Sequence, residues 1–200
     1  RSSRARLPTK AGRAVPPSAV PQAWHGHDNC STPRMVDHVD SILALAAVLV
    51  TGRDARAFLQ GQLTNDVRAL RADRALLAGV TTPQGRVLAL ATLLERPEGI
   101  VVVLPAALSD PIVARWRAHV LSAKVCFELG RWRVAGSTAI AAAPGLEPPP
   151  RNPGECRHGD AHSMLRWWAA DDRYLLLIPP STSIDGAEVS ATRSLEWHRA

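Results

Sequence analysis

VTGRDARAFLQGQLTNDV, residues 50–67, is the stretch that decides the fold of this 200-residue chain. Its apolar residues recur at the spacing of one helical face, which predicts a helix from 54 to 63. Gly61 interrupts that pattern, and a glycine inside a helix costs about 1 kcal/mol relative to alanine. The glycine therefore indicates a helix end, a close backbone approach or access for a ligand.

Hydrogen-bonding side chains surround Gly61 on both sides. They are Gln60, Gln62, Thr64, Asn65 and Asp66. Thr, Asn and Asp are common helix caps, so a second helical turn is expected to begin here. Two interpretations stay open on these residues alone: they cap a junction between helices, or they form the polar wall of a ligand site.

The sequence outside this stretch alternates short apolar runs with turn residues. Runs separated by Pro, Gly or Asp predict antiparallel hairpins. Successive hairpins with interspersed helices favour an α+β fold over a parallel α/β sheet. The predicted strands are 46–50, 76–80, 87–94, 100–104, 125–129, 131–135, 164–168 and 174–178.

Helices and loops complete this prediction. Ser109-Asp110-Pro111 predicts a helix start, because it combines a capping residue with proline in the first turn, and the apolar spacing continues to Leu121. Another helix is expected at 185–199, and the proline-rich stretch 141–162 is predicted as a loop or a degraded element. Trp167-Trp168 alternates across a predicted strand, so one ring is expected in the core and the other outside.

The charge of the chain is concentrated at its start. Residues 1–35 hold six of the 24 basic residues and one of the 18 acidic residues, so the rest carries a net charge of +1. The high pI therefore gives little support for nucleic-acid binding. This tail has no hydrophobic period and is predicted to be disordered. Upstream sequence translated before a start at Met35 and a basic targeting peptide both remain possible explanations of it.

Sequence motifs of common catalytic sites are absent from the chain. It contains no GxSxG elbow, P-loop, GxGxxG or HExxH motif, so no catalytic residue is assigned. Cys30, Cys126 and Cys156 lack paired spacing, which favours a reducing cytoplasm over a disulfide framework. A Cys156/His158/His162 cluster is interpreted as a solvated loop in preference to a metal site, and no metal is predicted.

No apolar run approaches the roughly 20 residues of a membrane helix, so no membrane partner is expected.

Two segments together resemble a known family. TGRDARAFLQGQLTNDV, followed by GVTTPQGRVLA at 79–89, is similar to the opening of the YgfZ-type folate-binding family, which shares the T-protein fold of the glycine cleavage system. LPAAL, VLSAKVCFE, RWRVAG, DDRYLLLIPP and SLEWHRA extend the likeness over most of 42–200. The resemblance implies antiparallel sheets with packed helices, arranged as a first folate-binding-type domain at 36–130 and the start of a second, truncated one at 131–200.

The same resemblance implies a function. Members of this family are expected to be cytoplasmic folate-binding accessory proteins that support iron–sulfur cluster assembly or repair and thereby tRNA modification. The implied ligand is tetrahydrofolate or a derivative; the implied partners are iron–sulfur proteins or their assembly machinery, with tRNA involved indirectly. The implied folate-binding residues are Gln62, Asn65, Asp66, Leu77, Arg86 and Leu90. Arg86 pairs with a folate carboxylate or faces water, and Asp66 contacts ligand or caps the next helix.

Two departures from the family pattern bear on activity. Where T-proteins carry a paired Asp after the hairpin turn, this chain has Ala89 and Leu90. Neither can exchange a proton or stabilise a developing cation, which disfavours the alternative function, a tetrahydrofolate-dependent aminomethyltransferase. The family's Lys-Gly-Cys-aromatic-x-Gly-Gln-Glu motif is also absent, so the sequence is expected to be a C-terminally incomplete fragment.

Overall fold

The computed structural model describes residues 41–137, 146, 148–168 and 173–182. The chain divides into units 1–32 and 33–200, and every described residue lies in the second. The tail expected to be disordered and the helix predicted at 185–199 lie outside the described residues.

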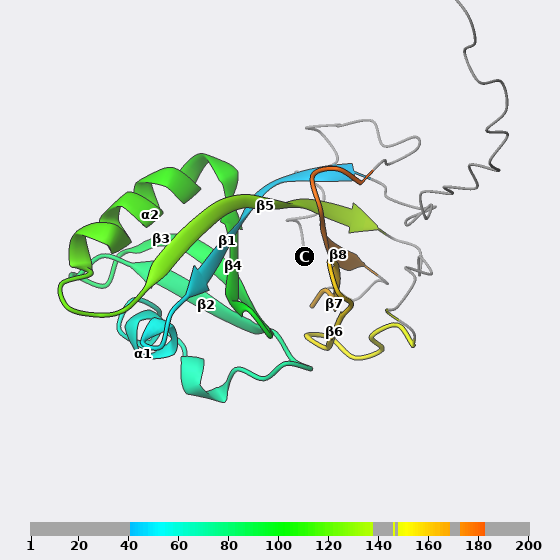
Figure 1. Ribbon diagram of the computed structural model, residues 1–200, viewed down its shortest axis with the longest axis horizontal. Helices are drawn as coiled ribbons and strands as arrows, with labels where there is room; N and C mark the ends of the chain where they lie inside the picture. Colours follow the sequence, from blue (N-terminus) through cyan, green and yellow to red (C-terminus); the bar gives the residue numbers. More distant parts are fainter. Residues whose placement is uncertain (1–40, 138–145, 147, 169–172, 183–200) are drawn as a thin grey trace, which may run out of the picture. The chain divides into compact units, whose positions relative to one another are not determined.

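One antiparallel sheet contains all eight strands of the described part, in the order β2-β3-β4-β1-β5-β8-β7-β6 (Figure 1). Two α-helices and a 3-10 turn accompany it, and the antiparallel pairing agrees with the prediction of antiparallel sheet. The strands are β1 (Ser41–Thr51), β2 (Leu76–Thr81), β3 (Val87–Arg96), β4 (Gly99–Pro105), β5 (Cys126–Ser137), β6 (Cys156–His158), β7 (Ser163–Arg166) and β8 (Tyr174–Ile178); the helices are α1 (Ala55–Gln60), η1 (Val67–Ala69) and α2 (Ala106–His119).

Three predicted hairpins are confirmed: β2 pairs with β3, β3 with β4, and β7 with β8. The turn of the first depends on Gly85, whose φ of +79° favours glycine. Two backbone hydrogen bonds close this turn, from Thr82 N to Arg86 O and from Gly85 N to Thr82 O, both at 2.9 Å.

β5 is one strand of 12 residues, where two short strands around Gly130 were predicted. Gly130 has a φ of +81° but does not end the strand. The ladder continues because β1 pairs with β5 on both sides of the glycine, through register shifts near Ala46. The domain boundary predicted after residue 130 falls inside this strand and stays a prediction.

The prediction that α2 starts at Ser109 is wrong by three residues. β4 turns at Pro105 directly into a helix that begins at Ala106 and contains Pro111. Ser109 does not cap; its hydroxyl donates to Ala106 O at 2.8 Å from inside the helix. The buried face of α2 includes Ile112, Val113 and Trp116.

Each face of the sheet has its own core. Alternate residues of β3 show the division: Ala89, Ala91 and Leu93 pack in the cluster beneath α1, η1 and α2, whereas Leu94 packs in a second cluster with β7 and β8. The second cluster also contains Trp132. The candidate site opens on this second face.

The two ends of the strand order meet. An isolated bridge pairs Arg74 with Glu155, just before β2 and β6 respectively. Ala75 N donates to Gly154 O at 2.8 Å, and Cys156 N donates to Asp73 O at 2.9 Å. The sheet therefore curls so that the residues leading into its first strand pair with those at the start of its last strand. β6 falls inside 141–162, so the prediction of a loop there is wrong for this segment.

Among the described residues, no helix is both long and apolar enough to cross a membrane.

Candidate functional site

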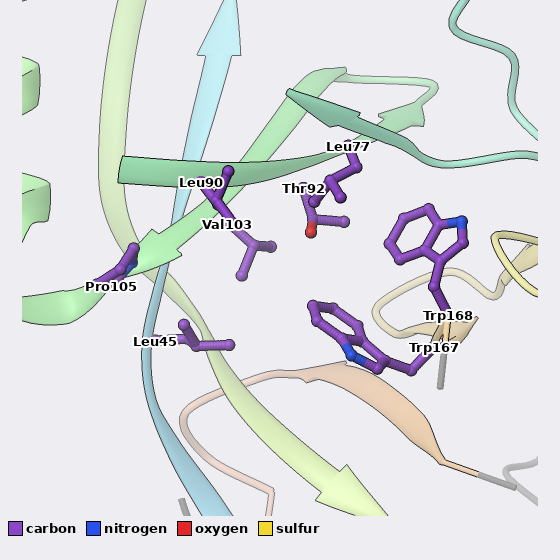
Figure 2. Close-up of a pocket in the computed structure, with 8 residues that line it drawn as sticks. All are labelled: Leu45, Leu77, Leu90, Thr92, Val103, Pro105, Trp167 and Trp168. Atoms are coloured by element: carbon purple, nitrogen blue, oxygen red, sulfur yellow. The ribbon is translucent and has the colours of Figure 1, made fainter. Parts of the chain in front are cut away.

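A cavity of about 480 Å³ opens on the second face of the sheet (Figure 2). Side chains from β1, β2, β3 and β4 form one wall, and two tryptophans after β7 form the wall opposite. The eight lining residues are Leu45, Leu77, Leu90, Thr92, Val103, Pro105, Trp167 and Trp168.

Strand register assembles the sheet wall. Thr92 lies opposite Leu77 on β2 and opposite Val103 on β4, so these three side chains form one row across the sheet. Leu90 is two residues from Thr92 on the same strand and therefore points to the same face. Thr92 is buried, whereas Leu77 and Leu90 are 42% and 62% exposed. The wall thus offers apolar surface that the described chain leaves uncovered.

Trp167 and Trp168 form the opposite wall, contrary to the prediction that one ring packs inside and the other faces out. β7 ends at Arg166, so strand alternation does not extend to the pair. Both rings are half-buried and line the same cavity. They meet edge to face, with centroids 5.5 Å apart and planes at 69°. Trp167 N donates to Arg173 O at 2.8 Å, which ties the pair to the start of β8.

Two of the predicted folate-binding residues, Leu77 and Leu90, line this cavity. Ala89 points the other way and packs in the cluster beneath the helices. Position 90 therefore faces the cavity and position 89 does not.

The other predicted residues lie beside the cavity wall or away from it. Asn65 Nδ2 donates to Leu77 O at 3.0 Å, so it contacts the backbone behind the wall. Asp66 caps η1 through Arg68 N, and hydrogen bonds from the side chain and backbone of Arg68 lower the pKa of Asp66. Gln62 is half-buried, and Arg86 is exposed on the β2–β3 turn. None of these four is among the lining side chains.

Sequence reasoning did not assign six of the lining residues to the site. They are Leu45, Thr92, Val103, Pro105, Trp167 and Trp168. The adjacent tryptophans carried a weak signal, because aromatic side chains commonly line ligand pockets. The four sheet residues carried none, since their pattern is that of ordinary core strands.

Cys156, His158 and His162 lie in and beside the β6–β7 hairpin, not in a solvated loop. Burial, followed by the Asp73 charge, raises the pKa of the Cys156 thiol to about 12. Burial also lowers the pKa values of both His158 and His162, with the Arg96 charge acting in the same direction. Both ring nitrogens of His158 have partners at 2.8 Å, Ser163 Oγ and Ala72 O. In the described part of the chain, no three His, Cys, Asp or Glu side chains group closely enough to hold a metal ion.

The chemistry open to the cavity is that of a binding site. Its volume lies within the usual range for small-molecule pockets, about 300–1,000 Å³. Thr92 supplies the one side-chain hydroxyl among the eight lining residues, and none of them is acidic or basic. Such a lining suits a ligand with a planar ring that makes few polar contacts with side chains.

The chain is similar in sequence to a curated protein and in fold to a solved structure. The chain is 26% identical over 135 residues to the tRNA-modifying protein YgfZ of Hamiltonella defensa subsp. Acyrthosiphon pisum (strain 5AT), a match covering 65% of this chain and 40% of that protein. It superposes with a TM-score of 0.60 and 13% identity on the glycine cleavage system aminomethyltransferase T from Bartonella henselae, covering 82% of this chain and 46% of that one. No family model matches.

The chain spans less than half the length of each of these two proteins. The structural likeness shows the fold, and the sequence likeness is to part of one YgfZ protein. Taken together, they support a fold of the YgfZ and glycine cleavage T-protein type for this chain.

Proposed function

We propose that this chain forms a folate-binding pocket of a YgfZ-type accessory protein and does not carry out aminomethyl transfer. The observation that carries the proposal is the cavity wall: Leu90 faces inward, and no acidic side chain lines the cavity. The ligand would be tetrahydrofolate or a derivative.

The cavity suits a folate in size and shape. The pterin of a folate is a fused bicyclic ring, and its planar pyrimidine half stacks on indole rings. Trp167 and Trp168 supply such surfaces, and Leu77 and Leu90 supply the apolar wall opposite. We propose Gln62, Asn65, Asp66 and Arg86 as further contributors, with Arg86 as the partner for a folate carboxylate. Asp66 and Asn65 would act through the backbone they hold.

A second candidate is a tetrahydrofolate-dependent aminomethyltransferase, which the shared fold favours. Transfer of an aminomethyl group develops positive charge near the folate nitrogen, and a carboxylate there would stabilise it. Position 90 faces the cavity but carries leucine. The nearest polar lining group on that strand is the Thr92 hydroxyl, which bears no charge. The cavity therefore supports binding better than transfer.

The wider role is proposed from the relative, whose name describes a tRNA-modifying protein. We propose that this protein acts in the cytoplasm and supports assembly or repair of iron–sulfur clusters, and tRNA modification through them. Its partners would be iron–sulfur proteins or their assembly machinery, with tRNA involved indirectly.

The test is equilibrium dialysis of the 200-residue chain against 5-formyltetrahydrofolate. Leu77→Asp places a charge against the ligand rings and is expected to weaken binding about tenfold or more. Val87→Asp is the matched control, because Val87 is on the paired strand β3, 58% exposed, and does not line the cavity. Absence of binding by the wild-type chain would overturn the proposal, and robust folate-dependent aminomethyl transfer would establish the second candidate.

A further inference from the structure

Gly154 lies against the ring of Trp168. A Cβ built on Gly154 would be 2.9 Å from Nε1 of that ring and 3.2 Å from Cε2 and Cζ2. Real Cβ atoms do not make contacts this short, so any side chain at position 154 requires the indole to move. Figure 2 shows the six-membered ring of Trp168 directed toward Leu77 and Thr92. Because Trp168 lines the cavity, displacement of its ring changes the width of the cavity.

The backbone of Gly154 is fixed on both sides. Its N–H donates to Arg166 O and its carbonyl accepts from Ala75 N, both at 2.8 Å. These bonds join the end of β7 to the start of β2. Retreat of Gly154 would break both bonds where the sheet ends meet, so the ring yields before the backbone does.

We infer that Gly154 is a positioning residue that sets the width of the slot between Trp168 and the Leu77–Leu90 wall, and that this slot takes the pterin ring. The inference rests on the proposed function, because it names the part of the folate that enters. A fused bicyclic ring covers the exposed surface of Leu77 and Leu90 on one side and the indole on the other. The single ring of the p-aminobenzoyl group covers less of the Leu77 and Leu90 surface and less of the indole.

Gly154→Ala is expected to weaken binding of 5-formyltetrahydrofolate about tenfold or more, measured by equilibrium dialysis with the 200-residue chain. Gly130→Ala is the matched control: Gly130 has a φ of +81°, against +79° at Gly154, but its Cβ would meet nothing within 4 Å. The Gly130→Ala substitution imposes similar backbone strain without contacting the Trp168 ring. Equal losses in the two variants would overturn the positioning role.

Two further measurements separate the parts of the inference. p-Aminobenzoylglutamate, which lacks the pterin, is expected to lose no affinity in Gly154→Ala; a loss equal to that of the folate overturns the pterin assignment.

Trp168→Phe replaces the clashing indole by a smaller ring. The double variant Gly154→Ala/Trp168→Phe is therefore expected to bind the folate as tightly as Trp168→Phe alone. Additive losses would show that Gly154 does not act through Trp168.

Circular dichroism tests the positioning without any ligand. Two indoles with centroids 5.5 Å apart and planes at 69° couple their transitions, so a moved Trp168 changes the amplitude of the exciton signal. Gly154→Ala is expected to change it, and Gly130→Ala is not. Failure of the wild-type chain to bind folate would defeat the proposed function while this comparison still decides the role of Gly154. An unchanged spectrum overturns that role even if folate binds.

Discussion

Arg96 is the buried cation that holds the β6–β7 hairpin against the end of β3. Its side chain is 2% exposed, and all five of its N–H groups have acceptors. Nε donates to Glu98 Oε1 at 2.8 Å, and the terminal nitrogens donate to four groups of the hairpin turn. These acceptors are His162 O, Ser163 Oγ, Gly159 O and Asp160 O.

Replacing Arg96 by methionine should lower the free energy of unfolding by about 3 kcal/mol, because it leaves the partly buried carbonyls of the hairpin turn and the 25% exposed Glu98 carboxylate without their donor. Urea denaturation measures the change. Arg131→Met is the control: Arg131 also approaches Glu98, at 3.9 Å, but is 45% exposed, so its loss should cost under about 1 kcal/mol. Similar costs in both variants would contradict the role given to Arg96.

The lowered pKa values of His158 and His162 predict that the free energy of unfolding falls in mildly acidic solution. Burial lowers their pKa values below the ordinary 6.5, so the folded state binds fewer protons than the unfolded state. Their contribution is complete above about pH 6.5 and is lost as the pH falls from there through the folded pKa values. Unfolding free energies measured between pH 7.5 and 5.5 should show this slope. It should flatten when both residues are changed to glutamine, whereas the exposed His119 changed to glutamine leaves it in place.

The two described cysteines should differ in reactivity. Burial raises the pKa of Cys156 to about 12, and its thiol donates to Ala72 O at 3.3 Å. Cys126 is exposed. Iodoacetamide at pH 8 should therefore label Cys126 and spare Cys156 until the protein is denatured, as peptide mapping would show. Early labelling of Cys156 would mean that the β6–β7 hairpin opens readily.

At the scale of elements, the turn between β1 and α1 is built on a glycine contact. Gly52 has a φ of +106°, and a Cβ there would lie 2.0 Å from Lys124 O. Asp54 Oδ2 also accepts from Lys124 N at 2.7 Å. The segments around Asp54 and Lys124 are therefore hydrogen-bonded to each other next to Gly52. Gly52→Ala should destabilise by about 2–5 kcal/mol, combining left-handed strain with a clash. Gly130→Ala introduces the left-handed strain without the clash and should lower the free energy of unfolding by about 1–2 kcal/mol. Thermal unfolding of the two variants measures the difference.

Element boundaries show what local sequence can predict. The β2–β3 hairpin was predictable because Gly85 and the flanking apolar runs act within a few residues. The start of α2 was not, because Pro105 ends the buried strand β4 and is also the residue before the helix, while the capping motif at Ser109 lies inside the helix. Gly130 likewise does not end a strand, since pairing with β1 continues past it. Long-range pairing overrides these local signals.

The candidate site was predictable only in part, because packing between distant segments also assembles it. Leu77 and Leu90 were assigned by resemblance, and both line the cavity. The tryptophans were assigned to a strand pattern that ends one residue before them, at Arg166. Their position opposite β2 and β3 depends on the curl of the whole sheet. No spacing within the sequence carries that information.

At the scale of the whole molecule, the sheet provides a test of the domain division predicted after residue 130. β1 and β5 are each paired on both sides along one continuous sheet, and both clusters include residues of β1. We expect α2 and β8 to unfold in one transition. Native-state hydrogen exchange should give their slowest amides the same opening free energy. Two distinct values would favour independently folding domains.

The meeting of β2 and β6 has a consequence for association with other chains. An open sheet edge presents unpaired N–H and C=O groups that recruit strands from other molecules, as in aggregation. Here the Arg74–Glu155 bridge and its flanking bonds occupy the approach to both terminal strands, and Thr64 further covers β2 by its backbone bond to Gly79 O at 3.0 Å. Within the described residues, partners are therefore expected to engage helices, turns and the exposed β2–β3 hairpin, not to add a strand.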